Sequence, residues 1–144
     1  MHFELTEEQR DIQRAAKEFA QNEFTSERGR EFDEKEEFPF DLWKKACELG
    51  FIGVHFPEEY GGAGMGILEN TLIVEEFCRA DTTIGSAIIL SDFSSEVIMR
   101  FGSEEQKEEV LPKVASGKAI TAGCYTEPEA GSDLTAIKTR AEKD

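Results

Sequence analysis

The chain stops being helical within residues 101–126, "FGSEEQKEEVLPKVASGKAITAGCYT". Ser103, followed three residues later by Gln106, has the spacing of a capping box that opens a helix. Gly117 stands where a helix-ending glycine is expected. Beyond it, "AITAGCYT" has β-branched and aromatic residues but no helical stripe, which predicts a strand. We therefore expect a mainly α chain that enters a sheet near its end.

Upstream of this point the apolar residues recur with helical spacing. Thr6 and Gln9 repeat the capping-box spacing ahead of a stripe that continues to residue 20. Pro39 can open a second helix, which Gly50 would end. Residues 67–79 also have a helical pattern, whereas the charged stretch 25–38 is interpreted as a connection between helices.

A long helix is predicted over residues 83–101. Its apolar residues cover most of the circumference, which is typical of a largely buried central helix. Asp92, Glu96 and Arg100 form its polar wedge, in which Glu96 and Arg100 have the spacing of a favourable ion pair.

Composition narrows the class of protein. The 144 residues fit one ordinary domain with its own core, and the formal net charge of −15 argues against nucleic acid and anionic membranes as partners. No apolar segment is long enough to predict a membrane span, and no signal peptide is recognised, so a cytoplasmic chain is expected. Three cysteines without a C-x-x-C pair and two distant histidines predict no metal site.

Residues 61–66, "GGAGMG", form a glycine-rich loop. The loop lacks the G-x-x-x-x-G-K-[ST] pattern of a phosphate-binding loop and does not follow a clear strand. A hinge or a close-packing turn is therefore favoured over a phosphate site.

Three segments together resemble the acyl-CoA dehydrogenase family of flavoproteins: "PEEYGGAGMG" at 57–66, "FGSEEQKEEVLPKVASGK" at 101–118 and "TEPEAGSD" at 126–133. The resemblance implies an orthogonal helical N-terminal domain over residues 1–118 and the first strand region of a β-barrel domain over residues 119–144. It also implies that a C-terminal helical bundle is absent from this chain. Members of the family are more than twice as long and commonly homotetrameric.

The resemblance also implies a place for FAD. The backbone of Gly123, Cys124, Tyr125 and Thr126, with the Thr126 hydroxyl, would lie along the N5/O4 edge of the flavin. Ser132 would donate to the cofactor pyrophosphate or to the CoA part of the substrate. From its residues alone, "EAGSD" at 129–133 is interpreted as a polar turn.

The implied reaction is FAD-dependent dehydrogenation of an acyl-CoA thioester. A carboxylate removes the α-proton, a hydride leaves the β-carbon for flavin N5, and the electrons pass to an electron-transferring flavoprotein. The usual base is a glutamate in the C-terminal half, which lies outside this sequence.

Asp92 has two interpretations. As a carboxylate facing an apolar pocket, with Glu96 one turn away, it would have a raised pKa and could act as the base on a cyclic acyl-CoA. Alternatively it belongs only to the polar wedge. The substrate expected is a short-chain or cyclic acyl-CoA, and the cyclic case depends on Asp92 alone.

Two other functions stay open. A related flavin oxidase or monooxygenase would share the fold but differ in how the flavin is reoxidised. A non-catalytic helical assembly module is the alternative from a different class. Among single residues, Cys124 is expected to be an inert buried thiol, and His55 a loop residue whose ring nitrogen is satisfied.

Overall fold

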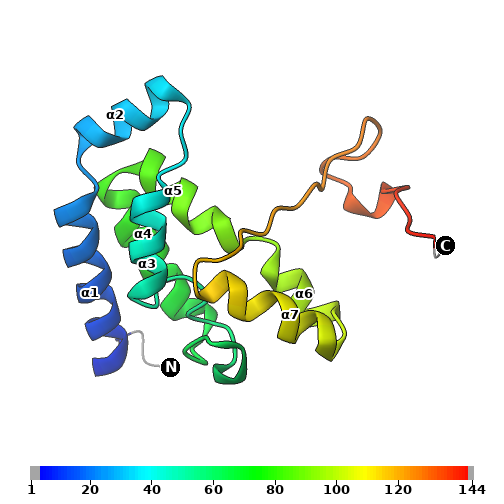
Figure 1. The fold of residues 1–144 in the computed structure, drawn as a ribbon, viewed down its shortest axis with the longest axis horizontal. Coiled ribbons are helices and arrows are strands. Elements are labelled where there is room, and N and C mark those ends of the chain that lie inside the picture. Colours follow the sequence, from blue (N-terminus) through cyan, green and yellow to red (C-terminus); the bar gives the residue numbers. More distant parts are fainter. Residues whose placement is uncertain (1–3, 143–144) are drawn as a thin grey trace.

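The computed structural model describes residues 4–142, and within them almost all regular structure is helical (Figure 1). The α-helices are α1 (Glu7–Glu23), α2 (Ser26–Lys35), α3 (Phe40–Glu48), α4 (Ile67–Ala80), α5 (Thr82–Ile89), α6 (Ser95–Phe101) and α7 (Glu104–Ala115). Short 3₁₀ turns are η1 (Glu58–Tyr60), η2 (Leu90–Asp92) and η3 (Leu134–Ala136). The last residues run out of the helical body as an extended arm.

The core lies where α1 packs along α4 and α4 packs on α5. Four phenylalanines from different elements meet there, with ring centroids 5.1–5.5 Å apart: Phe19, Phe24, Phe51 and Phe77. Aromatic rings bury large apolar areas and gain further from edge-to-face contact. This cluster fixes the helical scaffold from which the candidate site projects.

The two predicted capping boxes and the helix-ending Gly117 are confirmed. Thr6 and Gln9 form a capping box at α1, and Ser103 and Gln106 form one at α7. Gly117 adopts a φ of 67° directly after α7, where a side chain would strain the left-handed backbone. The chain therefore turns at that residue toward the arm.

The predicted connection over residues 25–38 is wrong, because Ser26–Lys35 form α2. The Thr25 side chain accepts from the Arg28 amide and caps the helix. Only a narrow side of α2 packs inward. There Gly29 is buried so closely that a Cβ atom would come within 2.5 Å of the Asp81 carboxylate. A helix that buries so little has no visible apolar stripe.

The single helix predicted over residues 83–101 is also wrong, because α5 and α6 are separate and joined through η2. At the break, the Ser91 carbonyl accepts from the Thr121 amide at 2.9 Å, and the Ser91 hydroxyl accepts from the Trp43 indole at 3.0 Å. Contacts with distant residues thus replace regular helical bonding. Phe93, beside the break, and Phe101, at the end of α6, are 54% and 82% exposed rather than buried.

The strand predicted for residues 119–126 does not form among residues 4–142. Its backbone runs extended, but the only β-type pairing described is an isolated bridge between Glu127 and Ala130. A strand requires a neighbour to accept its ladder of hydrogen bonds. No second strand lies beside it in this part of the chain.

The glycine-rich loop is a close-packing turn, as favoured from the sequence. A Cβ atom on Gly62 would lie 2.2 Å from the Phe56 carbonyl oxygen, and Gly61 has a φ of 82°. The backbone of this loop therefore needs glycine at two positions.

Candidate functional site

The extended segment 119–126 is anchored to the helical body at its start. The Thr121 amide donates to the Ser91 carbonyl at 2.9 Å, and the Ser95 and Thr121 hydroxyls lie 3.0 Å apart. Ser91 lies within the break between α5 and α6 and Ser95 is the first residue of α6, so the same break that disrupts the long helix fixes the position of this segment.

The side chains of the segment alternate between two faces, as in any extended chain. Thr121 and Tyr125 are half-buried against the helices, whereas Ala122, Cys124 and Thr126 are exposed on the other face. The predicted cofactor residues are therefore divided. Cys124 and Thr126 present their side chains outward, and Tyr125 packs its ring on Phe93 with centroids 5.6 Å apart.

The backbone amides of residues 122–126 donate to no acceptor within the described part of the chain. The next paired amide is that of Glu127, which donates to the Ala130 carbonyl at 2.8 Å. Backbone N–H groups are strong donors that proteins almost always satisfy when they are buried. Successive N–H groups of an extended chain point to opposite sides, so an acceptor edge placed along one side of this segment would meet the amides of alternate residues.

An exposed apolar surface borders the segment, formed by Leu90, Phe93, Val97 and Ile120. Two hollows open beside it. The α5 hollow, of about 320 Å³, is lined by Phe38, Ala87, Leu90, Ser91, Phe93 and residues 120–123. The α6 hollow, of about 380 Å³, is lined by Ser94, Val97, Ile98, residues 121–123 and Tyr125.

Asp92 is buried, at 8% exposure, and its carboxylate accepts from the Gly53 amide at 3.2 Å. Burial raises its pKa, which agrees with the expected direction, while the Gly53 hydrogen bond and the His55 ring act in the opposite sense. Asp92 does not share a polar wedge with Glu96 and Arg100, which pair with one another. Its carboxylate braces the loop before η1 and lines neither of the two hollows.

Two buried polar atoms near the site have no partner among the described residues: His55 Nδ1 and Ser94 Oγ. The expectation that the His55 ring nitrogen is satisfied is wrong at Nδ1, because the ring packs against Phe56 and its Nε2 faces Glu96 at 3.9 Å. The Ser94 hydroxyl lies under Gly123, where a Cβ atom would approach it to 2.6 Å. Nothing in the sequence distinguished Ser94 from its serine neighbours.

Cys124 and Ser132 are both exposed. The expectation of a buried Cys124 thiol is wrong, because this residue lies on the outward face of the segment. Ser132 lies in the turn beyond the Glu127–Ala130 bridge. That turn is held by the Glu127 carboxylate, which accepts from the Lys138 and Thr139 amides at 2.9 and 2.8 Å.

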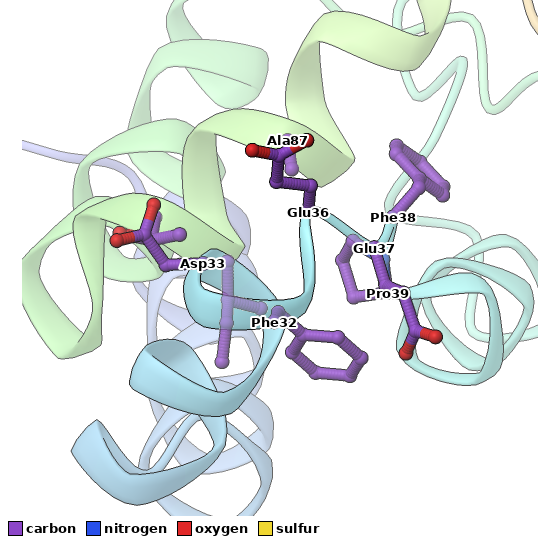
Figure 2. A pocket seen from close by; sticks show the side chains of 9 residues that line it. Phe32, Asp33, Glu36, Glu37, Phe38, Pro39 and Ala87 are labelled. Carbon is purple, nitrogen blue, oxygen red and sulfur yellow. The ribbon is translucent and has the colours of Figure 1, made fainter.

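A third hollow, of about 340 Å³, lies between the end of α2 and α5 (Figure 2). Phe32, Phe38, Pro39 and Ala87 line it together with carboxylates from Asp33, Glu36 and Glu37. These acidic side chains disfavour an anionic ligand there. None of the predicted site residues lines this hollow.

Residues 4–142 contain no group of three or more His, Cys, Asp or Glu side chains placed to hold a metal ion. In the same range, no helix combines the length and the apolar character that crossing a membrane requires.

The family model of the acyl-CoA dehydrogenase N-terminal domain matches residues 6–118. The chain belongs to the acyl-CoA dehydrogenase family. The resemblance found in the sequence motifs and the helical fold class are thereby confirmed.

Three similar proteins illustrate the relationship. Mitochondrial isovaleryl-CoA dehydrogenase from Bos taurus is 39% identical over 142 residues, covering 96% of this chain and 33% of that protein. An acyl-CoA dehydrogenase complexed with FAD from Bacillus anthracis is 35% identical, with a TM-score of 0.77, over 94% of this chain and 23% of that one. A chain in the structure described as electron transferring flavoprotein of Acidaminococcus fermentans is 39% identical, with a TM-score of 0.82, over 94% of this chain and 36% of that one.

The chain spans about a third of the length of the curated relatives that it matches. The family model covers residues 6–118, whereas the three similar proteins above match 94–96% of the chain. The boundary predicted at residues 118 and 119 stays a prediction, as do the roles of Gly123, Cys124, Tyr125, Thr126 and Ser132.

Proposed function

We propose that this chain forms the helical N-terminal part of a flavoprotein that uses FAD to dehydrogenate an acyl-CoA thioester. The observation that carries the proposal is the row of unpaired amides at residues 122–126, which lies beside an exposed apolar surface. A polar edge and an apolar face side by side are what a flavin ring and an acyl chain require. The FAD-bound relative from Bacillus anthracis supports the choice of cofactor.

The donor set of the segment fits a flavin. Alternate amides among Gly123 to Thr126, together with the exposed Thr126 hydroxyl, can donate to an acceptor edge on one side, and the side chains on the outward face of the segment are exposed. Ser132 is exposed and can donate to a phosphate of the cofactor or of CoA.

When bound, FAD would supply the hydride acceptor for the reaction. The residues of this chain would orient the flavin ring and the acyl group and would exclude water from the space between them. Hydrogen bonds from the segment favour the reduced, more electron-rich ring. Hydride transfer requires reacting atoms about 3–3.5 Å apart, so the acyl group would have to lie beside residues 123–126. The apolar surface of η2 and α6 borders these residues and would hold the acyl group there.

A short-chain acyl-CoA is the substrate that we propose. The hollows that flank the segment, of about 320 and 380 Å³, are at the lower end of the range of roughly 300–1,000 Å³ for ligand pockets. The name of the relative from Bos taurus, isovaleryl-CoA dehydrogenase, supports a small acyl group.

Asp92 as the base on a cyclic acyl-CoA stays a prediction. Burial keeps its pKa raised, as a base near neutral pH requires, but its carboxylate is directed to the Gly53 amide. In the assembled enzyme, Asp92→Asn would abolish turnover while flavin stays bound if Asp92 is the base. Unchanged turnover would assign Asp92 to bracing the loop alone.

The proposed partners are an electron-transferring flavoprotein, which would receive the electrons, and further copies of this chain in a homotetramer. The similarity to a chain in the structure described as electron transferring flavoprotein of Acidaminococcus fermentans supports the first. A cytoplasmic location is proposed from the sequence, and the tetramer from the resemblance to the family.

The test is a visible absorption spectrum of the purified protein, with intact mass measured on the same sample. A bound-flavin spectrum is expected for the assembled protein, followed by flavin bleaching when a short acyl-CoA is added anaerobically. Rapid reoxidation by oxygen after bleaching would favour an oxidase or monooxygenase instead.

A colourless protein that takes up no FAD on reconstitution with the complementary two thirds of a relative would contradict the proposal. In that case the non-catalytic helical assembly module would be the better description of the chain.

A further inference from the structure

The extended segment carries one hydroxyl on the face that it turns toward the helices. Thr121 is the only residue with a hydroxyl in residues 117–124. Its Oγ1 atom lies 3.0 Å from Ser95 Oγ, and its amide donates to the Ser91 carbonyl at 2.9 Å. No other residue of 120–126 makes a hydrogen bond to the helical body in the described part of the chain. The hydrogen bonds that hold the segment to the helices are therefore concentrated at Thr121.

The Ser95 hydroxyl is directed to this segment rather than to its own helix. Ser95 is the first residue of α6 and is fully buried. A serine at the start of a helix commonly bonds to the backbone of that helix through its hydroxyl. Among residues 4–142, however, the only hydrogen-bond partner of this hydroxyl is that of Thr121. Without Thr121 a buried polar group would lose its partner, which lowers stability.

The pair of hydroxyls selects one register of the segment. In an extended chain, neighbouring side chains point to opposite faces, so a slip of one residue exchanges the two faces. Such a slip would place Ile120 or Ala122 opposite Ser95, and neither of these side chains can form a hydrogen bond. It would also turn the exposed side chain of Thr126 toward the helices. The observed register keeps the Thr126 hydroxyl on the outward face.

We propose that the Thr121 and Ser95 hydroxyls form a positioning pair for the flavin, because they fix the register in which residues 123–126 meet its N5/O4 edge. The proposal rests on the proposed function, which places FAD along these residues. An extended chain advances about 3.3 Å per residue, so residues 123–126 begin roughly 7 Å beyond Thr121. The pair therefore acts on the flavin through the segment and contacts none of the reacting atoms.

Loss of the pair should lower the reduction potential of the bound flavin. Hydrogen bonds to the N5/O4 edge favour the reduced, more electron-rich ring, so a segment that is held less precisely stabilises the reduced state less. One ordinary hydrogen bond changes an equilibrium constant by roughly two- to tenfold. For a two-electron couple, a tenfold change corresponds to about 30 mV. We expect the potential to fall by about 10–30 mV when either hydroxyl is removed.

The experiment measures the reduction potential of the flavin by equilibration with reference dyes, in the assembled flavoprotein that contains this chain. Thr121→Val removes one hydroxyl and keeps the shape of the side chain, and Ser95→Ala removes the other. Either change breaks the same bond, so the double variant should shift the potential no further than the larger of the two single shifts. Urea unfolding of the same samples records any loss of stability separately.

Two control variants separate positioning from support of the fold. Thr121→Ser keeps the hydroxyl and should keep the parent potential. Thr71→Val makes the same chemical change on the exposed side of α4, where the Thr71 hydroxyl donates to the Ile67 carbonyl at 2.8 Å. This residue lies outside the candidate site, so its replacement should leave the potential unchanged.

The outcomes separate the two proposals. Single variants that keep the parent potential, with or without a loss of stability in urea, would overturn the positioning role. Shifts that add in the double variant would show that the two hydroxyls act separately, and would overturn the pair. Both results leave the proposed function intact. A folded Thr121→Val variant that holds no FAD while Thr121→Ser holds it would support the positioning role. An assembled parent that takes up no FAD would overturn the proposed function, and the positioning role with it.

Discussion

Two neighbouring residues, Ser91 and Asp92, determine how the site is built. Ser91 accepts from the Trp43 indole through its hydroxyl and from the Thr121 amide through its carbonyl. Asp92 accepts from the Gly53 amide. These bonds join three parts of the chain that are distant in sequence, and they turn the helix outward so that Phe93 faces the segment rather than the core.

The first prediction concerns the pH dependence of stability at Asp92. Burial raises its pKa above the ordinary value of 3.8, so the folded chain still holds a proton at pH values where the unfolded chain has lost it. The contribution of Asp92 to stability therefore falls as pH rises from about 3.8 through its folded pKa. Asp92→Asn keeps an oxygen that can accept from Gly53 and removes the charge, so it should be more stable than the parent at neutral pH.

Urea unfolding of the parent and of Asp92→Asn, measured from neutral pH down into the acid range, tests the predicted difference in stability. The difference in the free energy of unfolding should become independent of pH well below pH 3.8, where Asp92 is protonated in both states of the parent. A variant that is less stable than the parent at neutral pH would show that the ionised carboxylate stabilises the loop.

Among the elements, α2 has the least favourable end. Glu36 follows it with a φ of 52° and a ψ of 39°, the only non-glycine residue with a positive φ in residues 4–142. A left-handed backbone costs an ordinary residue about 1–2 kcal/mol. The turn that it makes sends the chain into α3 and forms the rim of the hollow shown in Figure 2.

We predict that Glu36→Gly raises the free energy of unfolding by about 0.5–1 kcal/mol, because the relief of backbone strain exceeds the added entropy of the unfolded chain. The matched variant is Glu34→Gly, two residues earlier and exposed within α2. It should lose about 1 kcal/mol through lower helix propensity. Equal losses for the two variants in thermal and urea unfolding would contradict the prediction.

At the scale of the whole molecule, the helical body and the arm differ in how they are held. Residues 127–142 make hydrogen bonds among themselves, and none is found between them and residues 4–118 in the described structure. Figure 1 shows the arm extending away from the helices. The stability of the chain should therefore come from the part that precedes residue 127.

A chain that ends after Thr126 should unfold with the same free energy as the parent, within about 0.5 kcal/mol. A chain that ends after Lys118 also loses the bonds from Thr121 to Ser91 and Ser95, and should be less stable by about 1–3 kcal/mol. Denaturant titrations of the three proteins give the comparison. A large loss on removing residues 127–144 alone would mean that the arm packs on the helices.

Several features of the fold could be predicted because they depend on neighbours in sequence. The capping boxes at Thr6 and Ser103 and the helix-ending Gly117 each involve residues within one turn of a helix. Such local signals identify helix ends well. The family could be predicted as well, because the motifs at 57–66, 101–118 and 126–133 lie in one order along the chain.

Other features depend on contacts between residues far apart in sequence, and only the tertiary structure decided them. The pattern over residues 83–101 predicts one buried helix, but Trp43, Gly53 and Thr121 draw its middle into other hydrogen bonds. In the same way, α2 forms although its pattern is polar, because a buried glycine lets it pack closely.

By itself, then, the sequence determined that this chain is mainly helical, where most helices begin and end, and which family it belongs to. The tertiary structure decided that Phe93 leaves the core to meet Tyr125, that the amides at 122–126 lie open, and that Asp92 is directed to a loop. The physical reason is the distance along the sequence over which each interaction acts. Capping and periodicity depend on residues within a helical turn. Packing and hydrogen bonds between distant residues override them when the free energy that these contacts contribute exceeds the local preference that is lost.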